Sequence, residues 1–218
     1  MLFSFITGAF ESVLTFFANM TGSYAISILI VTLAIKLILF PITASSVKMT
    51  EKMKKIQPMQ KEIQEKYKDD PEQMNGRLME LYKENDISKG MLSSCLGMLI
   101  PLPFLIIMYR VFLNVEFATT LLASGISTSF FWISNLTTPD LIILPILSAV
   151  TMFFSMRQTT ADKNQQMMTI VMPLVFGWIT RTLPAGAGLY WVFSNIIGIL
   201  QNLIIKQQIK AKEKRSAI

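Results

Sequence analysis

The chain has 218 residues, of which 52% are hydrophobic, and a mean hydropathy of +0.48. Only 16% of the residues are charged, whereas a soluble domain of this size carries about a quarter. There is no histidine and there is one cysteine. The sequence therefore lacks the usual general base and pH switch, and it offers no internal disulfide and no cysteine-based metal site.

The basic residues are concentrated in a few segments of the chain. Of the 20 Lys and Arg, 17 lie in 47–90, 156–166 and 206–218, and long stretches nearly free of charge separate these segments. This distribution predicts a helical membrane bundle with polar connections. The net charge of +6 is explained by membrane topology and anionic lipid better than by nucleic acid, so no specific nucleic-acid partner is expected.

Residues 1–20 predict an amphipathic helix lying in the membrane interface. Apolar residues recur at helical spacing and polar residues interrupt them. A signal peptide would have a basic segment before its apolar residues, and none is found here. The apolar set is Leu2, Phe3, Ile6, Phe10, Val13, Leu14 and Phe17.

The remaining chain predicts an all-α membrane protein with five transmembrane helices and a cytoplasmic helical hairpin. We expect a first transmembrane segment at 21–43, the hairpin at 44–90, four further spans within 91–210, and a basic cytoplasmic tail at 211–218. The apolar stretches themselves cover 23–43, 91–113, 141–156, 167–183 and 188–205. Each is close to the length needed to cross about 30 Å of hydrocarbon, although the third and fourth are short.

The hairpin carries local signals for two helices. In its second helix, Asp70 is placed as the N-cap, Pro71 fits the first helical position, and Gln73 sits where a capping-box partner belongs. The pair Asn85-Asp86 is expected to close the hairpin. Its two apolar stripes need only cover each other and its charges nearly cancel, so we expect a mobile hairpin, a candidate lid, that offers Met53, Met74 and Leu78 for apolar contacts when it opens.

Orientation follows from the Lys and Arg residues of the connections. The hairpin has ten, the loop at 157–166 has two and the C-terminal segment has five. The positive-inside rule places these three segments in the cytoplasm and the N-terminus outside. The charge pattern predicts a multi-pass protein in a membrane that borders the cytoplasm.

Lys36 is the most informative residue, because it lies about two helical turns inside the cytoplasmic end of the first span. A lysine at a helix centre costs roughly 2.5–3.5 kcal/mol on insertion scales. It can snorkel to the interface or face a water-filled cavity inside the bundle. We favour the cavity because Thr32 lies one turn away and further polar groups occur in later spans. These groups are Ser148, Thr151, Ser194, Asn195, Gln201 and Asn202.

Four segments resemble the YidC/Oxa/Alb membrane insertases, in order and with the spacing of that family. They are ITASSVKMTEKMKKIQPMQKEIQEKY after the first span, YKENDISKGMLSSCLGMLIPLPFLIIMYRVF at 82–112, FFWISNLTTPDLIILPILSAVTMFFSMRQ at 130–158, and MPLVFGWITRTLPAGAGLYWVFSNIIGILQNLII at 172–205. The resemblance covers about residues 22–210.

The resemblance implies a hydrophilic groove open to the cytoplasm and the lipid but closed to the outside. Lys36 occupies the position of the family's basic residue, which is usually Arg, with Thr32 one turn before it. Tyr190 and Trp191 match the family's aromatic pair, and we add Ser194 and Asn195 to the expected groove. The glutamine of the family's second-span pattern is Pro101 here.

The implied function is that of an insertase and chaperone for small membrane proteins, without enzymatic chemistry, cofactor or metal. Nascent membrane proteins and membrane lipids are the expected partners, and the resemblance adds the ribosome, the signal recognition particle receptor and the Sec translocon as candidates. The main alternative is a small membrane transporter or channel. That class would require paired charges along a route, or an internal repeat, and the sequence shows neither.

Overall fold

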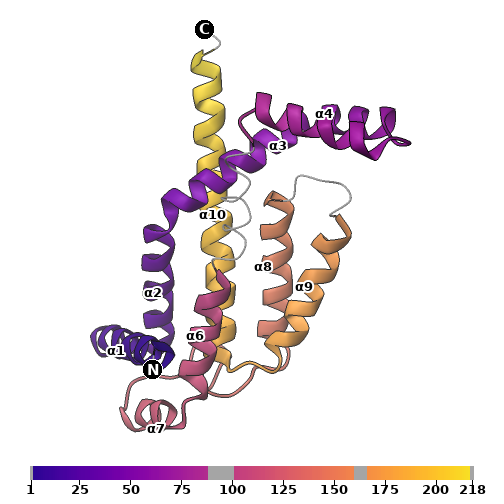
Figure 1. Cartoon of the computed structure of the whole chain (residues 1–218). Helices are drawn as coiled ribbons and strands as arrows, with labels where there is room; N and C mark the ends of the chain where they lie inside the picture. Colours follow the sequence, from indigo (N-terminus) through magenta and orange to yellow (C-terminus); the bar gives the residue numbers. More distant parts are fainter. Residues whose placement is uncertain (1, 88–100, 160–165, 217–218) are drawn as a thin grey trace.

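The computed structural model describes residues 2–87, 101–159 and 166–216. Within these ranges the protein consists of helices and loops and has no β-strand (Figure 1). The helices are α1 (Leu2–Thr21), α2 (Tyr24–Ile38), α3 (Phe40–Lys66), α4 (Pro71–Glu84), α6 (Pro101–Leu113), α7 (Val115–Ala123), α8 (Ile143–Thr159), α9 (Gln166–Thr180) and α10 (Ala185–Ser216).

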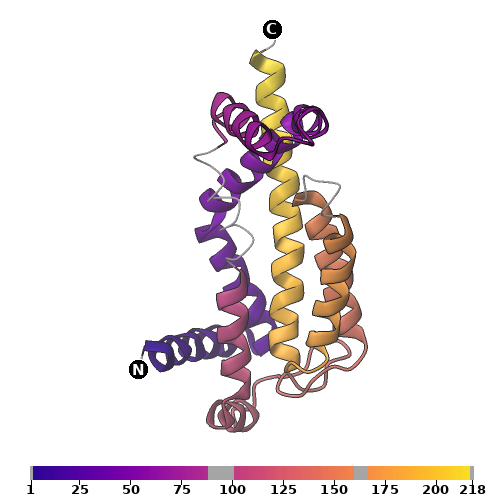
Figure 2. The same cartoon turned by 45° about the vertical axis from the view of Figure 1, so that its right-hand side comes forward.

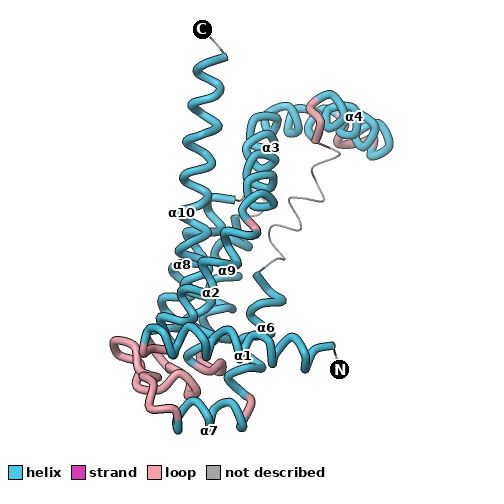
Figure 3. The backbone as a smooth tube through the Cα atoms, turned by 90° about the vertical axis from the view of Figure 1, so that its left-hand side faces the viewer, coloured by secondary structure: helices cyan, strands magenta, loops and turns pink. Residues whose placement is uncertain are grey.

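Helix α1 crosses the end of the bundle and does not run alongside the other helices (Figure 3). Leu14 and Ala18 are fully buried against the core, while Phe5 and Phe16 on other sides of the helix are 76% and 60% exposed. Residues 1–20 thus form the expected helix from residue 2 onward. One face packs on protein, and apolar side chains on the other sides are exposed. A position in the membrane interface stays a prediction.

Helices α2 and α3 meet at a sharp bend. The sequence predicts one helix up to Thr43, but α2 ends at Ile38 and α3 begins at Phe40, at an angle of 63° to it. Pro41 lies in the first turn of α3. Because proline has no N–H and its ring fits the first turn of a helix, it favours a new helix here over continuation of the old one.

The hairpin of α3 and α4 follows its local signals. The Asp70 side chain caps α4 by accepting a hydrogen bond from the Gln73 N–H at 3.0 Å. Asn85 follows the last residue of α4, and Asp86 takes a positive φ of 53° where the chain turns. The two helices share a small apolar cluster of their own, formed by Met49, Ile56, Leu81 and Ile87.

Helix α10 is the centre of the bundle. It packs against α2, α3, α6 and α8, while α8 and α9 form a pair of neighbours beside it (Figure 2). The main core lies around its first half and contains fully buried side chains from six helices and a loop. The largest are Leu14, Tyr24, Ile28, Met108, Leu121, Leu136, Leu144, Leu189 and Tyr190.

The helix bounds modify several expected segments. The basic segment expected as a tail at 211–218 continues α10 as far as Ser216. Of the second expected span, 91–113, the part before Pro101 lies outside the described residues. The third and fourth spans correspond to α8 and α9, and the segment after α6 contains the short helix α7.

Membrane-crossing capacity can be judged from length and composition. Among the described residues, one helix suffices alone, over Ala185–Lys212. Two bent pairs raise the number to three if each counts as one span, namely α2 with α3 and α6 with α7, and α9 is a shorter apolar helix. The all-helical membrane fold is confirmed at this level, and the count of five spans stays a prediction.

Helix α10 approaches α6 closely at Gly186. A methyl group on Gly186 would lie 2.4 Å from the ring of Phe112, which is 2% exposed and packs edge-on against Phe117. The ring is therefore enclosed and has little room to move. We predict that Gly186→Ala lowers the stability of the folded protein by about 1–3 kcal/mol through overpacking. Thermal unfolding in detergent measures this.

The matched control is Gly76→Ala in α4, where an added methyl group meets no atom within 4 Å. It removes a glycine from a helix interior without a clash, so it should leave the melting temperature unchanged or raise it. Adding Phe112→Leu to Gly186→Ala should restore part of the loss. Equal melting temperatures for Gly186→Ala and the unchanged chain would contradict the close approach.

Candidate functional site

Lys36 lies in the last turn of α2 and is half-buried. Its ammonium lies against α10, because a methyl group on Gly198 would be 3.5 Å from Lys36 Nζ. Within the described parts of the chain, no carboxylate pairs with this ammonium and no acceptor hydrogen-bonds to it. A bulkier residue at 198 would occupy the space beside the charge.

Gln201 links α10 directly to the same residue. Its Nε2 donates a hydrogen bond to the Lys36 carbonyl oxygen at 2.8 Å, and the side chain is only 6% exposed. Gly198 and Gln201 are three residues apart, so they lie on the same face of α10. From the sequence, Gln201 is predicted only to be a polar group of the last span. Its contact with Lys36 joins residues 165 apart, so no pattern of neighbouring residues predicts it.

The predicted groove residues Ser194 and Asn195 lie about one turn before Gly198 on α10. Asn195 Nδ2 donates to Thr151 Oγ1 of α8 at 3.4 Å, and Ser194 is buried. Polar side chains of α10 therefore extend from its contact with α8 toward its contact with Lys36. Thr32 is also buried, but its hydroxyl donates to the Ile28 carbonyl of its own helix at 2.6 Å.

Tyr190 and Trp191 lie deeper in the bundle. Tyr190 is 1% exposed and belongs to the main core, and Trp191 is 6% exposed. The Trp191 ring stacks on Phe176 of α9, with ring centres 4.8 Å apart and planes 8° apart. Both side chains thus have packing roles, and contact with a substrate stays a prediction for them.

Several polar side-chain atoms of this region are buried without a hydrogen-bond partner among the described residues. They include Ser148 Oγ of α8, and Trp191 Nε1 and Gln201 Oε1 of α10. Buried polar groups in proteins nearly always have a partner, so these exceptions mark buried polar positions along α8 and α10. The atoms come from the two helices on which the later polar groups were predicted.

A second polar cluster lies where α3, α8 and α10 meet, and sequence analysis missed it. Lys54 and Lys206 both approach Glu51, with N···O distances of 3.3 and 3.6 Å. Both lysines also donate to the Gln158 carbonyl oxygen, at 3.0 and 2.8 Å. The base of the hairpin is therefore attached to the bundle, whereas the outer part packs mainly on itself. The expectation of a mobile lid applies to that outer part.

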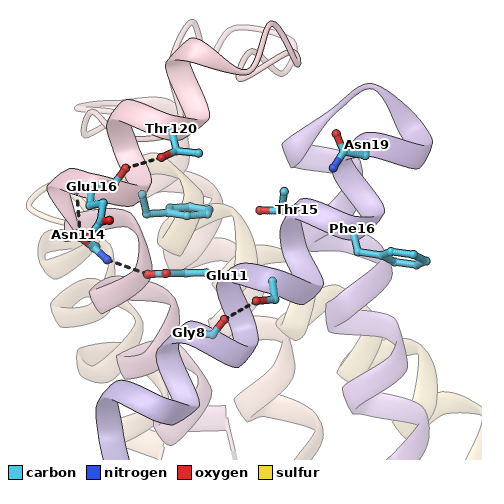
Figure 4. A pocket seen from close by; sticks show the side chains of 10 residues that line it. Gly8, Glu11, Thr15, Phe16, Asn19, Asn114, Glu116 and Thr120 are labelled. Carbon is cyan, nitrogen blue, oxygen red and sulfur yellow. Dashed lines mark hydrogen bonds between the residues drawn. The ribbon is translucent and has the colours of Figure 1, made fainter. Parts of the chain in front are cut away.

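A cavity lies elsewhere, between α1 and α7. It has a volume of about 540 Å³ and is open to the outside of the molecule. Figure 4 shows Glu11 of α1 reaching Asn114, whose Nδ2 donates to Glu11 Oε1 at 3.0 Å. This cavity is at the opposite end of the bundle from the hairpin (Figure 1). The described residues contain no group of three or more Cys, Asp or Glu placed to hold a metal ion.

These features define a class of protein: a helical membrane protein with a lysine that has no acidic partner among the described residues and lies against the polar face of a central helix. Residues 16–213 match the family model described as 60Kd inner membrane protein. The chain is 38% identical over 208 residues to "Membrane protein insertase YidC" of Caldanaerobacter subterraneus subsp. tengcongensis, covering 93% of this chain and 95% of that protein. The chain therefore belongs to the 60Kd inner membrane protein family, which includes YidC.

Other relatives agree over the same region. The protein of the same name from Geobacter sulfurreducens is 35% identical over 206 residues, covering 93% of this chain and 37% of that protein. This chain thus spans about a third of the length of that relative. A solved structure described as an active YidC insertase with its first transmembrane domain resolved has a TM-score of 0.72. It is 23% identical and covers 92% of this chain and 46% of its own, and it confirms the fold.

The cluster at the hairpin base yields a prediction. Glu51→Gln removes the carboxylate that Lys54 and Lys206 share, and the three side chains are only 21–31% exposed. We expect the attachment of α3 to weaken by up to about 1 kcal/mol, as for a partly exposed ion pair. Amide hydrogen exchange should then become faster in residues 45–56. Raising the salt concentration should reproduce part of this effect in the unchanged chain.

Glu80→Gln is the matched control. Glu80 pairs with Arg77 at 2.9 Å within α4, where both side chains are about 60% exposed. Its loss should leave exchange at the base of α3 unchanged. If Glu51→Gln and Glu80→Gln give the same exchange rates in residues 45–56, the attachment does not depend on Glu51.

Proposed function

We propose that this chain inserts small membrane proteins into the bacterial cytoplasmic membrane, as the names of its relatives indicate for those proteins. The observation that carries the proposal is Lys36, a cation inside the bundle without an acidic partner among the described residues. A charge in a membrane segment is costly and is normally paired or functional. An ammonium that faces a polar helix surface, and has no partner of its own, is suited to attract an acidic segment of an incoming chain.

Insertion of this kind requires no chemical step. The polar segment of a substrate must cross hydrocarbon, at a cost of several kcal/mol for each unsatisfied group. A hydrophilic groove open to the cytoplasm shortens that path, with Lys36, Thr32, Ser194 and Asn195 as its polar lining. The apolar segment then leaves sideways into lipid, where burial at about 25 cal/mol per Å² drives release.

Hydration of the groove is supported by the unpartnered polar atoms described above. Water is the usual partner of such atoms when protein offers none, provided that the site is polar. In this arrangement the protein crosses the membrane five times, with the N-terminus outside and the hairpin and C-terminus in the cytoplasm. Nascent membrane proteins are the substrates. This orientation would expose the hairpin and the C-terminus to three candidate partners: the ribosome, the signal recognition particle receptor and the Sec translocon.

Charge at position 36 is the test of this function. In cells that depend on this chain, we expect Lys36→Arg to support insertion and Lys36→Ala to reduce insertion of a substrate with acidic residues in its translocated segment about tenfold, equivalent to ~1.4 kcal/mol. Lys36→Glu should reduce it further by repulsion. Protease protection of the substrate's external segment measures insertion. The control substrate carries Asn and Gln in place of Asp and Glu and should depend little on position 36.

Normal insertion of the acidic substrate by Lys36→Ala would show that the lysine is an anchor at the interface, and the charge-based mechanism would fail. Protein amounts in the membrane must be equal across the variants. Lys36→Met, which keeps the length of the side chain without its charge, should behave as Lys36→Ala.

The hairpin is the proposed first contact for substrate. Met53, Met74 and Leu78 are partly buried, and Met53 packs on the apolar cluster that α3 and α4 share. We expect these side chains to become more exposed when the two helices separate. Photo-crosslinking residues at these positions should react with a ribosome-bound nascent membrane protein. Met59, which is 52% exposed, serves as a comparison on the same hairpin. Crosslinks from the three positions only to the hairpin and bundle would identify the hairpin as a fixed scaffold.

A further inference from the structure

The end of α2 leaves backbone carbonyl groups without helical hydrogen-bond partners. The last carbonyls of a helix lose their amide partners, and the Lys36 carbonyl lies in the last turn of α2. The Leu39 N–H is bonded to the Ile35 carbonyl. A continuing helix would pair the Lys36 carbonyl with the Phe40 N–H, but α2 ends at Ile38 and Phe40 begins α3 at an angle of 63°. An unsatisfied carbonyl inside a membrane bundle costs several kcal/mol, because lipid provides no donor.

Gln201 supplies the missing donor from another helix. Its Nε2 is 2.8 Å from the Lys36 carbonyl oxygen, and the side chain is buried, so water competes little for this bond. The bond therefore fixes the backbone of Lys36, the residue that carries the charge, to one point on α10.

Gly198 lies beside the side chain of Lys36. The ammonium of Lys36 lies 3.5 Å from where a methyl group on Gly198 would be, which is an ordinary contact distance, so only a side chain larger than a methyl group would occupy the space beside the charge. Backbone and charge of Lys36 are thus located by two residues on one face of α10. A hydrogen bond to a carbonyl alone would be an ordinary structural contact. The pair of contacts sets both where α2 ends and where its charge lies.

We propose that Gln201 is a positioning residue for Lys36, and that Gly198 keeps open the space in which the ammonium is presented to acidic substrate segments. This inference rests on the proposed function. Gln201 acts through Lys36 and not on substrate itself. Without its bond, the end of α2 can shift relative to α10, and the charge is no longer held at the polar face of that helix.

The first experiment measures geometry without any insertion. Lys36→Cys, in a Cys95→Ser background, keeps the carbonyl that Gln201 binds and turns position 36 into a probe. Its reaction rate with a charged, membrane-impermeant thiol reagent is measured in inside-out vesicles. Gln201→Met keeps side-chain length without the donor and should change this rate by about fivefold, as expected for one ordinary hydrogen bond. Asn202→Leu, which also removes a buried amide from α10, is the matched control and should change the rate less.

The second experiment measures insertion with the acidic and neutral substrates described above. Gln201→Met should lower insertion of the acidic substrate about fivefold and leave the neutral substrate nearly unchanged. Combined with Lys36→Ala, it should cause little further loss, because residues that act through one group are not additive. Gly198→Leu fills the space beside the ammonium without removing the Gln201 bond. It gives a second route to the same selective loss if Gln201→Met does not accumulate.

The outcomes separate this inference from the proposed function. Equal loss of both substrates with Gln201→Met, or full additivity with Lys36→Ala, would assign Gln201 a structural role only and overturn the inference. An unchanged labelling rate at position 36 would also overturn it. If Lys36→Ala inserts the acidic substrate normally, the proposed function fails, and the labelling rates alone then decide whether Gln201 positions Lys36.

Discussion

The packing of one long helix, α10, against four others is the constraint on which the remaining structure depends. Helices α2 and α6 contact it from one direction and α8 from another, and α3 crosses it near the hairpin. At about 1.5 Å per residue, its 32 residues extend for about 48 Å. The same helix therefore carries the buried aromatic core at its start and the cluster with Glu51 further along.

The candidate site follows from this arrangement. A bundle in lipid can place polar groups only where other protein or water meets them. Polar groups of α10 satisfy this condition by facing α2 and α8, and the ammonium of Lys36 lies in the same region, beside Gly198. The close approach at Gly186 is different, because there the backbone of α10 meets the apolar ring of Phe112. Glycines of α10 thus lie both where the helix packs on an apolar ring and beside the charge of Lys36.

Local chemistry made much of the fold predictable. The cap at Asp70 and the apolar stretches of α8, α9 and α10 were read from sequence, because capping and helical periodicity act over a few residues. The break at Leu39 is not predicted because Pro41 falls inside an apolar stretch that continues to Thr43, although its position suits the start of a helix. The site was predicted in part. Lys36 was recognised by its cost in lipid, whereas its contact with Gln201 joins distant segments and no pattern within either segment encodes it.

The position of α10 along the chain has a consequence for biosynthesis. Contacts of α1 with α2, and of α8 with α9, join neighbours in sequence and can form as soon as those helices emerge. Among the described residues, most of the packing between these groups runs through α10, which is translated after all other described helices. Until α10 is made, the early helices lack this packing, and Lys36 lacks its partner on α10. A protein proposed to help others enter the membrane would itself pass through a half-assembled state that needs protection.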